Sequence, residues 1–133
     1  MCRRSIEIQQ RWAQAYGDFF VSGDGKISCW IKKDTHGLRV KRGFGIQREG
    51  RLIRLSRCIW LPRLAQLIEM AQQPGRRYDS VTMDFFNWVK APYGENQASP
   101  SKQFSSTEQL WLAFIMETRY RKKWNGIDWT ATG

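Results

Sequence analysis

The sequence is poor in the residues from which metal centres and disulfide frameworks are built. It holds one histidine and three cysteines in 133 residues. A structural zinc site needs about four converging ligands, and a disulfide framework needs an even set of cysteines. Cys2, Cys29 and Cys58 are odd in number and widely spaced. We therefore expect reduced thiols, with neither a metal nor a cofactor.

Groupings typical of catalysis are also missing. The single histidine, His36, lies in Asp34-Thr35-His36-Gly37, a sequence typical of a turn. Gly23-Asp24-Gly25-Lys26 lacks the spacing of a phosphate-binding loop and indicates a hairpin turn. The acidic residues Asp79 and Asp84 flank an apolar segment and form no pair at catalytic spacing. We therefore expect a protein that is not an enzyme.

Long apolar runs are absent as well. No stretch of about 18 apolar residues could span a bilayer, and residues 1–7 contain no apolar segment of the kind found in secretory signals. We expect a cytoplasmic or nucleoid-associated protein with no membrane partner. A length of 133 residues is that of one domain. Within it we expect a sheet-plus-helix core over residues 1–75 and a C-terminal extension over residues 76–133.

The chain does have an excess of positive charge, and this charge is concentrated in the first half. The formal net charge is +10. Residues 1–63 hold 14 Lys and Arg against 5 Asp and Glu, whereas residues 64–133 hold 8 against 7. Such segregation favours a polyanionic partner bound by residues 26–63, and nucleic acid is the first candidate. The alternative is a solvated basic surface without a partner.

Turn residues and period-two patterns predict an α+β fold that begins with a short helix over residues 5–16. An antiparallel four-stranded meander follows, with strands expected over residues 18–22, 26–33, 38–47 and 51–59. Gly43 and Gly45 indicate a bulge in the third of these strands. We expect the bulge to shift the later side chains of that strand onto the opposite face.

The second half of the chain is predicted to add helices to this sheet. Apolar residues at helical spacing predict an amphipathic helix that has Pro62 in its first turn and stops at Gln73-Pro74-Gly75. Residues 78–89 are apolar and aromatic and are expected to form a strand-like segment. Residues 90–103 indicate a loop. The spacing of Ser105 and Glu108 is that of a capping box and predicts a helix reaching to about Trp124.

Alternation along residues 26–33 separates an apolar face from a basic one. Ile27, Cys29 and Ile31 share the face expected to be buried, while Trp30 lies with the lysines on the other. Cations that contact phosphates, interleaved with rings that stack on unpaired bases at about 1–3 kcal/mol each, are typical of surfaces that bind single strands. The residues expected to bind nucleic acid are Lys26, Trp30, Lys32, Arg39, Lys41, Arg42, Phe44, Arg54 and Arg57. The alternative for Trp30 and Phe44 is burial under the N-terminal helix or a partner subunit.

Residues 26–72 follow a recognisable order of strand, turn, strand, glycine turn, strand and helix. Its best pieces are Ile27-Ser28-Cys29-Trp30-Ile31-Lys32, Leu38-Arg39-Val40-Lys41-Arg42-Gly43-Phe44, Arg48-Glu49-Gly50 and Arg57-Cys58-Ile59-Trp60-Leu61. The stretch resembles the transcriptional positive-cofactor-four family of single-stranded-DNA-binding proteins. The resemblance implies a coactivator-like homodimer whose curved sheets form a basic channel for single strands. Cys58 stands where the family has glycine, and residues 76–133 have no counterpart there.

These observations lead to a principal hypothesis and two alternatives. The principal one is a non-enzymatic protein that binds single-stranded DNA or RNA in transcription, replication or recombination. An alternative is a phage or plasmid accessory protein that inhibits or adapts a nucleic-acid-processing complex, because seven Trp suit a protein-binding surface. The C-terminal extension would then carry the partner site. Another is duplex binding through Arg119, Arg121, Lys122 and Lys123, which could instead complement a helix dipole.

Overall fold

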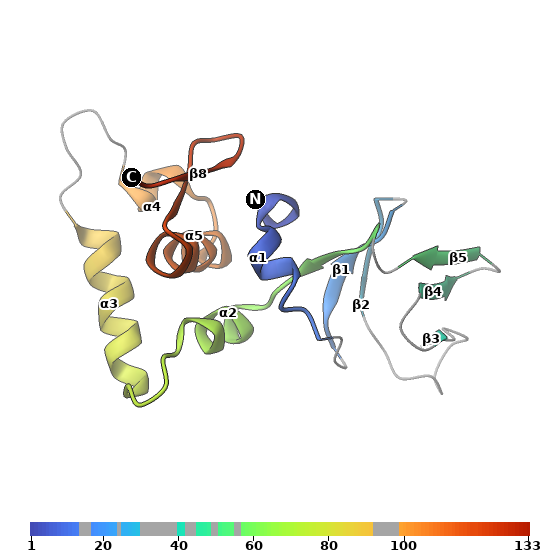
Figure 1. Ribbon diagram of the computed structural model, residues 1–133, viewed down its shortest axis with the longest axis horizontal. Helices are drawn as coiled ribbons and strands as arrows, with labels where there is room; N and C mark the ends of the chain where they lie inside the picture. The colour runs from blue at the N-terminus through green and yellow to red at the C-terminus, as the bar shows by residue number, and fades with distance from the viewer. Residues whose placement is uncertain are drawn as a thin grey trace. The chain divides into compact units, whose positions relative to one another are not determined.

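The computed structural model describes most of the chain as two compact units. The described residues are 1–13, 17–23, 25–29, 40–41, 45–48, 51–54, 57–91 and 99–133. One unit comprises residues 2–62 and the other comprises residues 63–133 together with Met1. The fold is mixed α and β, with three-stranded antiparallel sheets and several helices (Figure 1). The expectation of a single domain over residues 1–133 stays a prediction.

The unit of residues 2–62 begins with a 3-10 helix η1 (Cys2–Arg4) and a short helix α1 (Ile6–Gln9). The predicted helix over 5–16 is therefore wrong in length, although its last three residues lie outside the described part. Backbone hydrogen bonds continue one further turn, from the N–H of Arg11 to Ile8 and from that of Trp12 to Gln9. A side-chain hydrogen bond follows this turn, because the Trp12 Nε1–H donates to Asp18 Oδ2 at 2.9 Å.

Strand β1 (Phe19–Val21) is the centre of the first sheet. It pairs antiparallel with β2 (Ile27–Cys29) on one side and with β6 (Ile59–Leu61) on the other. The predicted hairpin at Gly23-Asp24-Gly25 is confirmed by the pairing of β1 with β2. The pairing with β6 was not predicted, because it joins segments almost forty positions apart and has no local sequence signal.

The two faces of β2 are the reverse of those predicted for its part of residues 26–33. Phe20 lies opposite Ser28 in β2 and Trp60 in β6. Phe20 and Trp60 are buried, and the Trp12 ring lies parallel to that of Trp60 at 6.3 Å. Ser28 therefore belongs to the core face, whereas Ile27 is 68% exposed on the other. The central strand decides the faces, because burying its large ring leaves the flanking residues of β2 on the outer side.

A second sheet consists of β3 (Val40–Lys41), β4 (Gly45–Arg48) and β5 (Arg51–Arg54), in that order. The hairpin predicted at Arg48-Glu49-Gly50 is confirmed, since Arg48 pairs with Arg51. The single bulged strand over residues 38–47 is wrong. Its two parts, β3 and β4, pair antiparallel with each other.

The predicted fourth strand over residues 51–59 is also divided. Its first four residues form β5, whereas Ile59 begins β6 in the first sheet. In the described part of the chain, two three-stranded sheets therefore stand in place of the predicted four-stranded meander. Period-two patterning identifies strand segments but does not say which of them pair.

The unit of residues 63–133 contains α2 (Leu64–Ala71), α3 (Tyr78–Lys90), α4 (Pro100–Gln103) and α5 (Thr107–Tyr120). Residues 111–116 of α5 are all buried, so this helix is the core of the unit. α2 confirms the predicted amphipathic helix, but it begins at Leu64, so Pro62 lies outside its first turn and not in it as predicted. Its chain continues through Gly75, whose φ of +79° is the left-handed conformation that glycine adopts without strain.

The segment predicted as a strand over residues 78–89 is a helix instead. Val81 and Phe85 are buried at a spacing of four, and Trp88 follows three residues later on the same side. The Phe85 ring stacks on Trp111 with centroids 4.0 Å apart and planes 8° apart. Aromatic content favoured a strand, but the helical spacing of the residues that pack on α5 outweighs that propensity.

The C-terminal helix is confirmed, with corrections at both ends. Its N-cap is Ser106, whose hydroxyl accepts from the N–H of Gln109 at 3.2 Å, one residue later than predicted. At its other end Arg121 adopts a left-handed conformation with φ of 54°. A hairpin of β7 (Lys122–Trp124) and β8 (Trp129–Ala131) follows. The Asn125-Gly126 pair was its sequence signal, and the prediction of a helix to Trp124 missed it.

Candidate nucleic-acid interface

The structure describes side chains for two of the nine residues predicted to bind nucleic acid. Lys26 and Arg57 are both exposed. The backbone of Lys41 lies in β3 and that of Arg54 in β5. The other five predicted residues, Trp30, Lys32, Arg39, Arg42 and Phe44, lie outside the described residues.

The β1–β2 hairpin positions Lys26. The backbone N–H of Ser22 donates to the carbonyl of Lys26 at 3.0 Å, and the hydroxyl of Ser22 donates to the same carbonyl at 3.1 Å. The N–H of Gly25 donates to the carbonyl of Ser22 at 2.8 Å, with Gly25 at a φ of +81°. Because these bonds close the loop tightly, Lys26 lies at a fixed end of the sheet, immediately before β2.

Arg57 approaches the same hairpin from the β6 side. A Cβ added at Gly23 would lie 3.4 Å from the Cβ of Arg57, so the arginine stem packs against the hairpin loop. In register, Val21 pairs with both Ile27 and Ile59, which places Lys26 and Arg57 just beyond the same row of the sheet. Two of the predicted cations therefore share one end of the sheet β2-β1-β6, although 31 positions separate them in the sequence.

The second sheet brings together two more of the predicted residues. Lys41 pairs with Gly45, and Gly45 pairs with Arg54, so the three occupy one row across the sheet. Two residues further along β4, Gln47 pairs with Leu52. In the last row of this pairing, Arg48 lies opposite Arg51. Gly45 is the first residue of β4. The sheet pairing thus places cationic residues on both sides of a position that has no side chain.

The cysteines do not form a reactive site in the described structure. Cys58, the residue before β6, is buried, and Cys29 is half-buried. Burial also raises the pKa of the Cys2 thiol above its ordinary value of 9.0, although the N-terminal ammonium acts in the opposite direction. Since the thiolate is the nucleophile, a raised pKa makes Cys2 less reactive.

The basic cluster at the end of α5 does not form one helix face. Arg119 lies on α5 and donates to the backbone carbonyl of Gln72. Arg121 is the C-cap residue, and Lys122 and Lys123 belong to β7. Lys123 forms an ion pair with Glu117 at 3.2 Å. These positions do not fit a basic helix lying in a duplex groove.

Comparison with protein-family models, with curated proteins and with solved structures found no match. Within the described residues, no helix has the length and apolar character needed to cross a membrane. The same residues contain no group of three or more His, Cys, Asp and Glu side chains arranged to hold a metal ion.

Proposed function

We propose that the protein binds single-stranded nucleic acid through the basic residues of its first unit, which comprises residues 2–62. The supporting observation is the row Lys41–Gly45–Arg54 in the second sheet, because it aligns two of the predicted cations across one position that lacks a side chain. The net charge of +9 over residues 1–63, from 14 basic and 5 acidic residues, agrees with a polyanionic partner.

The energetic basis of the proposed binding is the release of counterions from phosphates. Lys26 and Arg57 are exposed and can exchange solvent for phosphate oxygens at one end of the first sheet. Trp30 and Phe44 are proposed to stack on unpaired bases. The resemblance to the positive-cofactor-four family supports the same choice of ligand and adds a homodimer to the proposal.

The test is fluorescence anisotropy with a labelled poly-dT oligonucleotide, compared with a duplex and an RNA of equal length. We expect binding to the single strand to weaken steeply between low and moderate salt. Changing Lys41 and Arg54 together to Gln is expected to weaken binding, whereas Lys102→Gln, an exposed lysine of the other unit, is the matched control. Affinity that stays flat with salt, or equal loss in both variants, would rule the proposal out.

A specific observation favours the alternative, a protein partner, but on the first sheet and not on the C-terminal extension where it was predicted. The outer face of the first sheet carries six apolar residues, of which Ile27 is 68% and Phe19 is 43% exposed. The others are Val21, Cys29, Ile59 and Leu61, which share these two rows. If this face binds a protein, capture after nuclease treatment should be lost in Ile27→Lys, while binding to oligonucleotide should remain.

A further inference from the structure

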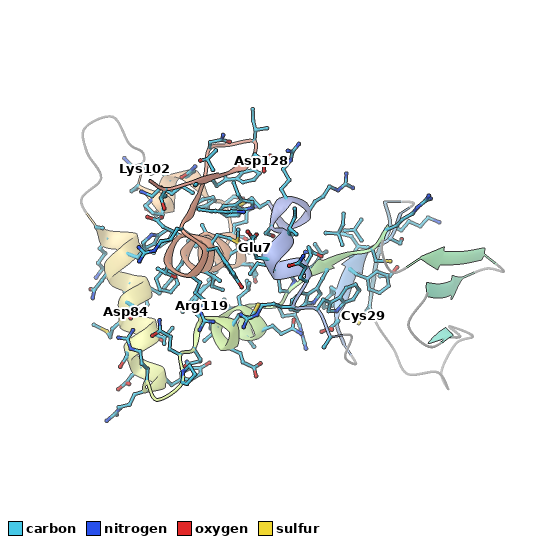
Figure 2. All side chains as sticks on the ribbon, viewed as in Figure 1. Glu7, Cys29, Asp84, Lys102, Arg119 and Asp128 are labelled. Carbon is cyan, nitrogen blue, oxygen red and sulfur yellow. The ribbon has the colours of Figure 1, made fainter. Side chains whose placement is uncertain are left out.

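The unit of residues 63–133 contains a cavity of about 330 Å³ lined by residues of α2, α3 and α5 and of the segment between α2 and α3. Figure 2 labels two of the polar lining residues, Asp84 on α3 and Arg119 on α5. Apolar lining comes from Val81, Trp88 and Phe114. This volume lies within the range of small-molecule sites, which combine an apolar wall with a few polar groups that set orientation.

The aromatic wall of the cavity is held in place by its neighbours. The Trp88 Nε1–H donates to Glu117 Oε2 at 3.0 Å, and the other oxygen of Glu117 pairs with Lys123 at 3.2 Å. The Trp88 ring also meets that of Phe114 at 5.7 Å with an interplanar angle of 60°. Because contacts on two sides fix the indole, its orientation is set before any ligand arrives.

The polar lining has a surplus of positive charge. Arg76 and Asp84 both line the cavity and pair at 2.7 Å, so each offsets the charge of the other. Arg119 supplies the remaining charge. One of its terminal nitrogens donates to the carbonyl of Gln72, and a guanidinium has five N–H donors in all. The cavity therefore suits an anion, and the ion pair prevents Asp84 from repelling it at full strength.

We infer that this cavity binds a nucleotide, with its aromatic base against Trp88 and its phosphate at Arg119 and Arg76. A planar ring matches the fixed indole, and arginine is the residue best shaped for phosphate oxygens. Asn87 also lines the cavity, and its amide offers both a donor and an acceptor to a base edge. The site lies wholly in the second unit, so it does not depend on strand binding by the first.

The inference is tested on the full chain with adenosine 5′-monophosphate as the probe, by following the indole N–H signals in nuclear magnetic resonance. The Trp88 signal is assigned by its loss in Trp88→Phe. We expect the nucleotide to shift this signal, while adenosine and inorganic phosphate each bind more weakly. A poly-dT oligonucleotide with a 5′-phosphate, compared with one without it, shows whether the site takes free nucleotides only or also the end of a strand.

Variants test whether the cavity holds the nucleotide. Arg119→Gln and Arg76→Gln are each expected to bind the nucleotide about tenfold more weakly. Arg77→Gln is the matched control, because Arg77 is the exposed neighbour of Arg76 and does not line the cavity. Arg119 also contacts Gln72, so unfolding of Arg119→Gln is checked by its melting curve, and Arg76→Gln then carries the test.

The outcomes separate this site from the proposed strand binding. Loss of nucleotide binding in Arg76→Gln with normal binding in Arg77→Gln supports the cavity. An unshifted Trp88 signal at saturating nucleotide, or equal binding by all variants, overturns it, whether or not the protein binds poly-dT. Nucleotide binding without poly-dT binding would instead remove the strand-binding proposal and leave the cavity site standing.

Discussion

The side-chain amide of Gln9 makes two hydrogen bonds with the backbone of Trp60. Its Oε1 accepts from the Trp60 N–H at 2.8 Å, and its Nε2 donates to the Trp60 carbonyl at 3.0 Å. These are the two bonds that a residue in a neighbouring strand would make. The amide therefore stands in for a strand at the edge of β6, and the same Nε2 also reaches the carbonyl of Cys2 at 3.2 Å.

Replacing Gln9 should destabilise the first unit more than replacing an exposed glutamine does. In Gln9→Ala both Trp60 backbone groups lose their partner at a partly buried site, which should cost about 1–3 kcal/mol of unfolding free energy. The neighbouring Gln10→Ala is the control, since Gln10 is exposed and should change stability by less than about 0.5 kcal/mol. Urea unfolding measures both, and equal midpoints would contradict a role for the amide.

Truncation of two adjacent phenylalanines in α3 should change the unfolding free energy by very different amounts. Phe85 is buried and stacks on Trp111, so Phe85→Ala should lower the unfolding free energy by about 3–5 kcal/mol. Phe86 is exposed, and Phe86→Ala should change it by about 0.5 kcal/mol or less. Thermal or urea unfolding distinguishes them.

The half-buried thiol of Cys2 should make stability fall at high pH. Burial raises its pKa in the folded protein above 9.0, its ordinary value. The stabilisation is fully present below the unfolded pKa and is lost as the pH rises through the folded pKa, because the folded state then has to bury a thiolate. Cys2→Ala should therefore lose less stability than the natural sequence as the pH rises above about pH 8. Parallel pH profiles in urea unfolding would contradict this.

Alkylation of Cys2 provides a second check on the raised pKa. Its rate with iodoacetamide, followed by mass spectrometry, should reach half of its maximum above pH 9.0.

Lys26 and Arg57 should contribute to the salt dependence of strand binding. If each contacts a phosphate, changing it to Gln should reduce the slope of log affinity against log salt by about 0.7. Lys102→Gln should leave the slope unchanged. Titration of a poly-dT oligonucleotide at several salt concentrations measures the slopes, and an unaltered slope in both variants would exclude these two cations from the interface.

Local signals in the sequence were enough to predict those elements that form through local contacts. Gly23-Asp24-Gly25 and Arg48-Glu49-Gly50 indicated two hairpins, and both are present. Spacings of three and four predicted α2 and most of α5. In each case the turn residues or the apolar stripe lie within a few positions of one another, so neighbouring residues contain the information.

Residues 78–89 show where such reasoning fails. Aromatic residues favour strands on average, and that preference suggested a strand here. The buried position of Phe85 against Trp111 depends on a helix that lies far along the chain. Packing outweighs intrinsic propensity because burying one large ring contributes several times the free energy by which strand and helix preferences differ.

For the candidate site, the sequence by itself was sufficient to predict the types of residue and the concentration of positive charge before residue 64. The order of strands in the sheets, the row that holds Lys41 and Arg54, and the cavity beside Trp88 came only from the tertiary structure. Charge is a property of each residue wherever it lies. Strand order and cavities arise from contacts between distant segments, which depend on how all the apolar faces are buried together.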